Sequence, residues 1–242
     1  SIQTSIPLTK LRLGDMNDNQ WGSLHGAIDK MNHAKLFVDD QGSININQLR
    51  SKLRKLKNQH PEIEIAVIDY LQIMQGVGTA DRHQQVSEIS RGLKMLAREL
   101  EMPIVALSQL NRGLEARNDK RPMLSDIRES GSIEQDADII LFVYRDDVYL
   151  FKEEKEREKA AKSEGKEFVS EYIEKDEEDA EIIIGKQRNG PTGHVKLVFQ
   201  KKLTRFVDAP KFSAGIETVY ENVDTRSATI DVGEASISMT PI

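Results

Sequence analysis

Two polar side chains follow apolar runs of the sequence and could meet a bound phosphate. Asp69 ends the β-branched run 63–68, and Gln109 follows the apolar run 103–108. The carboxyl ends of neighbouring parallel strands meet at the sheet edge where α/β proteins bind ligands. A carboxylate there can hold the water shell of Mg²⁺ on nucleotide phosphates, and an amide can contact a γ-phosphate. Ordinary strand ends that lead into polar loops are the alternative interpretation of both residues.

A polar string at residues 126–138 could present positive charge and backbone amides to nucleic acid. It combines Arg128 with the small residues Ser130, Gly131 and Ser132. A guanidinium group and free backbone N–H groups are typical contacts to a phosphate backbone. A capped loop that leads into a helix is the structural alternative.

Two cations lie beside a tight turn near the end of the chain. The turn Asn189-Gly190-Pro191 follows Lys186 and Arg188. A rigid, exposed arginine can stabilise transition-state charge in a phosphoryl-transfer site, including the site of a neighbouring subunit. The motif alone favours a solvated basic turn.

Both helices and strands must position these residues. Helical spacing or amphipathic patterning predicts helices within residues 1–34 and over 45–59 and 81–100, and short apolar runs predict strands at 35–40, 63–68, 103–108 and 137–144. The continuous run 63–68 suits a parallel strand that is buried on both faces. The runs 182–184, 194–199 and 205–207 predict a small antiparallel set that finishes the sheet. This order indicates a doubly wound α/β sheet.

Composition limits the classes of function. The chain has 242 residues, a net charge of -6 and no cysteine, which excludes disulfides and is compatible with a reducing cytoplasm. No apolar run is long enough to span a membrane, and the first residues do not form a signal peptide. Residues 152–181 hold 13 acidic and 7 basic side chains, so the acidity belongs to one segment and the rest of the chain is neutral. We expect this acidic segment to be an exposed helix or a mobile insertion.

Taken together and in this order, the strings around Asp69, Gln109, 126–138 and 186–191 resemble the C-terminal motor domain of the DnaB family of bacterial replicative helicases. The resemblance covers residues 5–207 apart from the acidic segment. It implies an α/β fold with a RecA-like P-loop NTPase core, whose mostly parallel sheet ends in an antiparallel hairpin. It also implies a cytoplasmic homohexamer with ATP sites between subunits, which encircles single-stranded DNA, translocates 5′ to 3′, and binds a primase and a helicase loader.

The resemblance assigns a role to each motif residue by position. Asp69 matches the Walker B acid that holds Mg²⁺ through water, and Gln109 matches the γ-phosphate sensor. The DNA-backbone positions are Arg128, Glu129, Ser130 and Gly131, and the positions that reach a neighbour's ATP are Lys186, Gln187 and Arg188, with Arg188 as the arginine finger.

One family motif does not occur in the sequence. No Gly-x-x-x-x-Gly-Lys-Ser/Thr string is present, and the family's catalytic Glu lies upstream of the matched residues. We therefore expect a fragment: a motor domain over 1–207 without its P-loop part and a loosely held tail over 208–242, with no ATP hydrolysis by the chain alone. The alternatives are a RecA-type recombinase, a circadian-clock-type ATPase, and a non-catalytic fragment that binds DNA or a partner.

Overall fold

The computed structural model describes residues 1–76, 81–127 and 131–210. The first half of the chain contains α1 (Leu8–Leu13), α2 (Asp18–His33), α3 (Ile46–Gln59), β1 (Ala66–Ile68), η1 (Leu71–Ile73), α4 (Arg82–Glu99), β2 (Ile104–Ala106) and η2 (Arg112–Ala116). The second half contains η3 (Leu124–Asp126), α5 (Gly131–Asp136), β3 (Ile139–Tyr144), α6 (Asp146–Ser163), β4 (Glu177–Gln187), β5 (Gly193–Gln200), η4 (Lys201–Leu203) and β6 (Arg205–Asp208). The tail beyond residue 210 lies outside the described residues.

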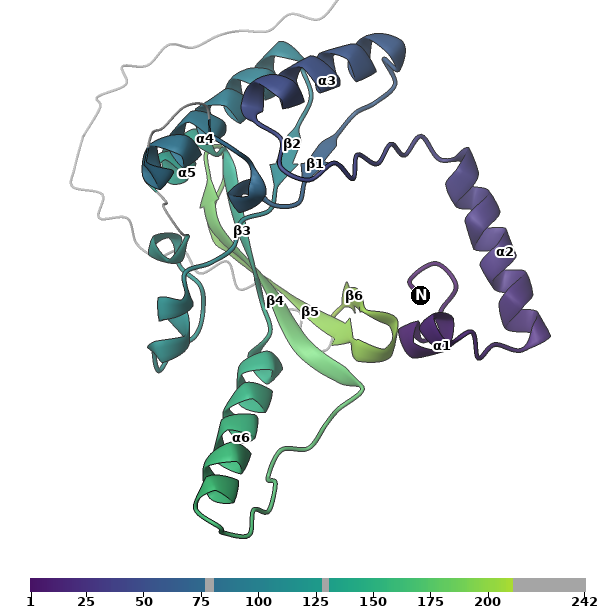
Figure 1. The fold of residues 1–242 in the computed structure, drawn as a ribbon, viewed down its shortest axis with the longest axis vertical. Helices are drawn as coiled ribbons and strands as arrows, with labels where there is room; N and C mark the ends of the chain where they lie inside the picture. The colour runs from purple at the N-terminus through teal and green to yellow at the C-terminus, as the bar shows by residue number, and fades with distance from the viewer. Residues whose placement is uncertain (77–80, 128–130, 211–242) are drawn as a thin grey trace, which may run out of the picture.

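The strands form one parallel pair and one antiparallel sheet (Figure 1). β1 and β2 pair in parallel, with Ile68 opposite Ala106. The second sheet has the order β3-β4-β5-β6, and all of its pairs are antiparallel. The expected α/β arrangement is present, but the antiparallel part is larger than a terminal hairpin, because β3 pairs with β4 rather than with β1 or β2.

The two long helices α3 and α4 form where the sequence predicts them, and both begin at a capping residue. The Asn45 side chain accepts hydrogen bonds at the start of α3, and the Asp81 side chain accepts one from the amide of Gln84 at the start of α4. The predicted inward face of α4 is largely confirmed, because Val86, Ile89, Leu93 and Leu96 are all buried, whereas Leu100 is only partly buried.

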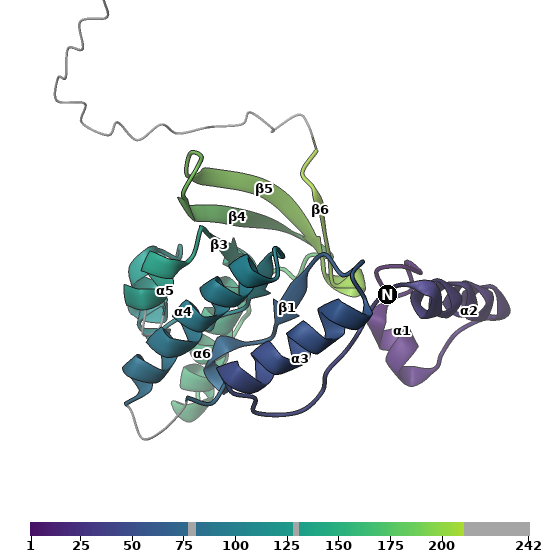
Figure 2. The same ribbon diagram turned by 90° about the horizontal axis from the view of Figure 1, so that it is seen from above.

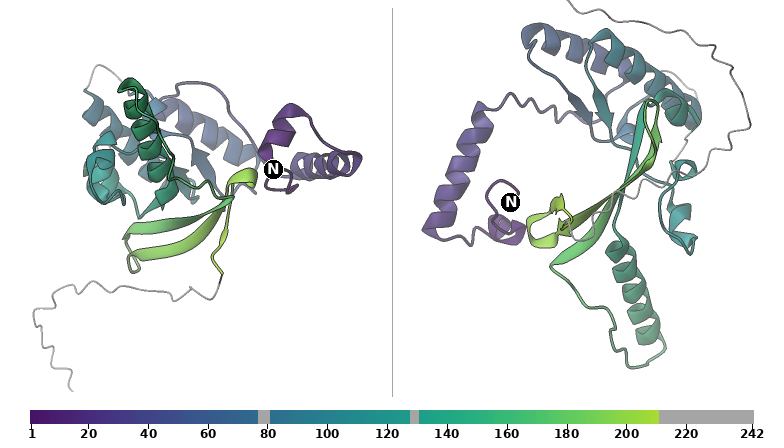
Figure 3. Two further views of the ribbon diagram at one scale, coloured as in Figure 1. Left: turned by 90° about the horizontal axis from the view of Figure 1, so that it is seen from below. Right: turned by 180° about the vertical axis from the view of Figure 1, so that it is seen from behind.

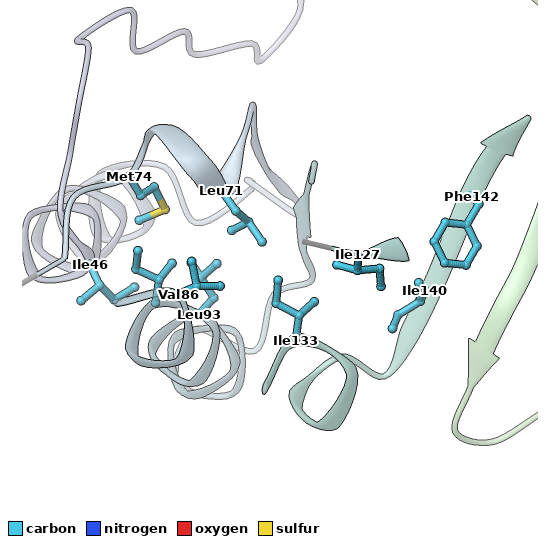
Figure 4. Close-up of a cluster of buried hydrophobic side chains, with 10 residues drawn as sticks. Ile46, Leu71, Met74, Val86, Leu93, Ile127, Ile133, Ile140 and Phe142 are labelled. Atoms are coloured by element: carbon cyan, nitrogen blue, oxygen red, sulfur yellow. The ribbon is translucent and has the colours of Figure 1, made fainter. Parts of the chain in front are cut away.

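The main core lies between these helices and the strands (Figure 4). Its buried members are Ile46, Leu71, Met74, Val86, Ile89, Leu93, Ile127, Ile133, Ile140 and Phe142. Residues from α3, α4, α5 and β3 therefore share one cluster, which fixes the segments before and after residues 128–130 relative to α4.

Only one face of the parallel pair is covered within the described residues. Helices α3 and α4 lie along one side of β1 (Figure 2), while Val67 is 62% exposed and Val105 is 43% exposed on the other side. The prediction of burial on both faces is therefore wrong for this part of the chain. Continuous apolar runs do not reveal which of their faces a helix will cover.

The predicted strand at residues 35–40 is also wrong. These residues form neither a strand nor a helix, with Leu36 61% and Val38 81% exposed. They join α2 to α3, and α2 stands apart from the other long helices (Figure 3). A strand needs a partner edge to satisfy its backbone groups, and no described strand lies beside this run.

The acidic segment begins as an exposed helix, which is the first of its two expected forms, and ends in the start of a strand. Helix α6 begins at Asp146, before the expected boundary, and β4 begins at Glu177, inside the acidic segment. The first residues of β4 alternate between two faces. Glu177 and Asp179 face solvent, whereas Glu178 and Ala180 are buried. The described part of the acidic segment is thus one helix, a connecting stretch and the start of a strand.

Candidate functional site

Asp69 and Gln109 lie at the same edge of the parallel pair. The amide of Leu107 donates to the carbonyl of Ile68 at 2.9 Å, and the amide of Leu71 donates to the carbonyl of Leu107 at 2.9 Å. These bonds continue the pairing of β1 and β2 past the ends of both strands. Both Asp69 and Gln109 are exposed to solvent, so a ligand at this edge can reach them.

A third residue, Gln72, joins the two strand ends. Its Nε2 donates to the Ser108 hydroxyl at 2.9 Å, and its Oε1 accepts from the amide of Gln109 at 3.1 Å. The side chain therefore fixes the backbone at Gln109 from the η1 turn that follows Asp69. Gln72 was not among the predicted site residues, and its position three residues after the strand-end acid is the feature that could have indicated it.

Past Gln109, residues 110–127, here called the linking segment, are held in a defined path. Arg117 forms two bonds to the carboxylate of Asp126, at 2.8 and 3.2 Å, and Asp126 is 7% exposed. The amide of Asn111 donates to the carbonyl of Asp126 at 2.7 Å. The two ends of the linking segment thus lie side by side, with Leu110 bridged to Ile127.

The predicted DNA-binding residues lie at the end of the linking segment. Arg128, Glu129 and Ser130 are outside the described residues. Gly131 is exposed and begins helix α5. Among these four residues, the structure therefore places Gly131, directly after the fixed end of the linking segment.

Lys186 and Arg188 lie at the end of β4, beside α5. Lys186 donates to the carbonyl of Glu134, and Arg188 donates to the carbonyl of Gln135 at 2.8 Å. The last carbonyls of a helix lack partners within the helix and attract cations. Both side chains therefore cap α5 in this chain, which is a structural role that the motif alone did not indicate.

The register of β4 directs these cations. A β-bulge at Gly185 shifts the pairing between Leu141–Ile184 and Ile140–Lys186, and bulges commonly redirect side chains near functional sites. Gln187 pairs with Ile139 at the start of β3. Arg188 keeps 48% of its side chain exposed while its Nε lies 3.5 Å from Asp138.

Asp138 links Arg188 to helix α4. Its carboxylate also accepts from Lys94 of α4, and this hydrogen bond lowers the pKa of Asp138 below its ordinary value. A second bond, from the Ser90 hydroxyl to Asp136 at 2.8 Å, ties α4 to α5. The cations at the end of β4 are therefore fixed against α4, which begins after the strand-end site.

The structure does not bring the two groups of predicted residues together. Within the residues it describes, no hydrogen bond or ion pair joins Asp69 or Gln109 to Lys186, Gln187 or Arg188. The same residues contain no cluster of three or more His, Cys, Asp or Glu side chains that could hold a metal ion. A single exposed carboxylate such as Asp69 fits Mg²⁺ that keeps its waters, since Mg²⁺ at phosphates needs few protein ligands.

No helix in the described part of the chain combines the length and the apolar composition that crossing a bilayer requires.

Comparisons with known proteins agree with this geometry. Residues 1–208 match the family described as DnaB-like helicase C terminal domain. The replicative DNA helicase DnaB of Helicobacter pylori is 49% identical over 221 residues, which cover 86% of this chain and 45% of that protein. The Geobacillus stearothermophilus DnaB is 48% identical over 206 residues, which cover 84% of this chain and 40% of that protein. The chain thus spans less than half the length of these relatives.

Solved structures give the same result for the fold. One solved ATPase domain superposes with a TM-score of 0.72 at 39% identity, covering 86% of this chain and 68% of that one. A DnaB-like replicative helicase, described with its interactions with primase, also gives a TM-score of 0.72 at 39% identity, covering 86% of this chain and 46% of that one. The expected fold class is therefore confirmed.

Proposed function

Because the chain belongs to the family of DnaB-like helicase C-terminal domains, which implies nucleotide binding, we propose that it forms most of the motor domain of a replicative DNA helicase. The match favours this function over a recombinase or a clock-type ATPase. In this proposal residues 1–207 are the motor domain and 208–242 are a tail. The full-length protein uses ATP hydrolysis to move 5′ to 3′ on single-stranded DNA and to separate duplex DNA.

The observation that carries the proposal is the joined pair of strand ends. Asp69 holds the water shell of Mg²⁺, which neutralises phosphate charge when it is bound. Gln109 contacts the γ-phosphate, and Gln72 fixes the Gln109 backbone. Because Gln109 leads directly into the linking segment, a change at the nucleotide can reach the DNA-binding residues through a short, well-bonded path.

Lys186, Gln187 and Arg188 serve the ATP site of a neighbouring subunit in this proposal. They end a strand far along the chain from Asp69 and make no described contact with it, which supports action between subunits rather than within one. The half-exposed Arg188 side chain leaves its guanidinium group accessible while Asp138 holds it. A closed homohexameric ring supplies such a neighbour at every interface.

Contacts to DNA come from Arg128, Glu129, Ser130 and Gly131, next to the linking segment. Contacts of this kind read the phosphate backbone and not the base sequence, so they suit a motor that must pass over any sequence. A primase and a helicase loader are the proposed protein partners. The related helicase described with its interactions with primase supports the first of these.

The test uses the full-length protein with Arg188→Ala. We expect ATP turnover to fall by about 10³-fold, the lower value typical of a lost arginine finger, while nucleotide binding stays close to that of the wild type. Lys202→Ala is the matched control, because Lys202 is an exposed cation that pairs with Asp176 at the surface. Since Arg188 also caps α5, thermal melting of both variants must show an intact fold. Normal turnover in folded Arg188→Ala would contradict the assignment.

A further inference from the structure

Helix α6 makes contacts along two opposite faces. Successive residues of an α-helix are rotated by about 100°, so Tyr149, Lys152 and Glu153 fall on one side of α6. Asp147, Phe151 and Glu154 fall on the opposite side. Each group has its own partners outside the helix, and neither set of partners belongs to the strand-end site described above.

The first face of α6 contacts the linking segment. Lys152 forms an ion pair with Glu115 of η2, and Lys120 forms one with Glu153 of α6. Lys120 also lies 5.8 Å from the ring centre of Tyr149. The hydrogen bond from Lys152 lowers the pKa of Glu115 below its ordinary value. Two ion pairs therefore join α6 to residues 115–120.

The charges in these two pairs alternate. The helix presents a cation at Lys152 and an anion at Glu153, and the linking segment presents an anion at Glu115 and a cation at Lys120. Exchanging the partners would place like charges together, so the pattern fixes one relative position of the two elements. Exposed pairs contribute little energy each, but together they specify a register.

The second face of α6 contacts the stretch that connects it to β4, and the residue before the helix contacts the antiparallel sheet. Asp147 accepts a hydrogen bond from the Tyr172 hydroxyl at 2.5 Å, and the rings of Phe151 and Tyr172 lie 5.4 Å apart. Just before the helix, Arg145 bonds to the buried Glu178 of β4 at 2.6 Å. The first half of α6 is therefore held by contacts on both of its faces.

The linking segment is held from β4 as well. Arg121 makes two bonds to the carboxylate of Glu181, at 2.7 and 2.8 Å. Glu115 and Lys120 thus lie in a stretch held by Arg117–Asp126, by Arg121–Glu181 and by α6. The distal half of α6 differs, because Glu158 there pairs with Lys155 and Lys162 of the same helix, as in an ordinary solvated helix.

We propose that Lys152 and Glu153 of α6 are positioning residues that set the linking segment for DNA binding. This inference rests on the proposed function, since it assigns to the acidic segment the support of the path between Gln109 and the DNA-binding residues. The acidic segment, which was expected to be an exposed helix or a mobile insertion, then takes part in the response to DNA through Lys152 and Glu153.

The test uses charge reversal in the full-length protein. Lys152→Glu and Glu115→Lys each place like charges together, and the double variant restores an opposite pair. Each single variant should raise the single-stranded DNA concentration that half-activates the ATPase by about three- to tenfold. The double variant should return to within about twofold of the wild type. Basal turnover and turnover at saturating DNA should not change.

Lys162→Glu is the matched control, because Lys162 pairs with Glu158 within the distal half of α6. The inference is overturned if both single variants behave like this control, or if the double variant shows no recovery.

Hydrogen exchange of the amides in residues 112–121 provides a readout that does not need DNA. Faster exchange in the single variants, reversed in the double variant, supports the positioning role. Unchanged exchange contradicts it. If the wild-type protein shows no DNA-stimulated ATPase, the proposed function fails, and the exchange result alone decides whether α6 positions the linking segment.

Discussion

Replacing Glu178 with alanine should remove a large part of the stability of the chain. The Glu178 side chain is 2% exposed and bonds to Arg145 at 2.6 Å and to Lys201 at 2.5 Å. Arg145 is itself partly buried, with its guanidinium group 3.8 Å from the ring centre of Phe199. Removing one partner of a buried ion pair costs about 3–5 kcal/mol. Without Glu178, Arg145 loses the carboxylate to which it bonds, whereas Lys201 keeps Asp147 at 3.0 Å.

This cost should appear as a lower melting temperature. For a chain of this size, each kcal/mol shifts the midpoint by about 2–4 °C, so Glu178→Ala should melt roughly 6–20 °C below the wild type in circular dichroism. Asp179→Ala is the matched control, since Asp179 is the next residue of β4 and faces solvent. A melting temperature for Glu178→Ala within about 2 °C of this control would refute the stabilising role of the buried carboxylate.

Two further predictions follow from particular contacts. Gln72→Ala should lower the ATP turnover of the full-length protein by about tenfold, because the Gln109 amide loses its acceptor; unchanged turnover would show that Gln109 does not depend on Gln72. The amides of residues 171 and 172 donate to the Glu154 carboxylate and should lose protection against hydrogen exchange as the pH falls below about 4. Burial raises the pKa of Asp147, but hydrogen bonds from Tyr172 and Lys201 outweigh it and leave that pKa lowered, and the Ser170 hydroxyl lowers the pKa of Glu154. A carboxyl group with a lowered pKa stabilises the folded state at pH values above its ordinary pKa, and this contribution is lost as the group is protonated. Constant amide protection from about pH 7 to pH 3 would contradict the assignment.

The sequence predicted the elements whose evidence is local. Helix α4 shows its buried face in the spacing of Val86, Ile89, Leu93 and Leu96, and α3 shows its start in the cap at Asn45. The strand-end position of Asp69 followed from an apolar run that ends in an acid. These features depend on residues within a few positions of each other, so one sequence is enough to find them.

Other features depend on partners that are distant in the chain. The run 35–40 has strand-like composition but no described partner edge, so it stays unpaired. Glu178 looks like part of a solvated acidic stretch, although Arg145 and Lys201 bury it in β4. Gln72 lies in a polar loop by sequence, and its bond to Ser108 forms only because the chain after β2 lies beside it in the fold. The capping of α5 by Lys186 and Arg188 likewise arises only when β4 pairs with β3.

Strand displacement by the full-length protein tests the helicase assignment most directly. The substrate is a forked DNA duplex with a labelled strand and a free 5′ tail on the strand that the protein encircles. We expect displacement that requires both the 5′ tail and hydrolysable ATP, and that Arg188→Ala abolishes. A protein that binds the fork and hydrolyses ATP but displaces no strand would contradict the assignment.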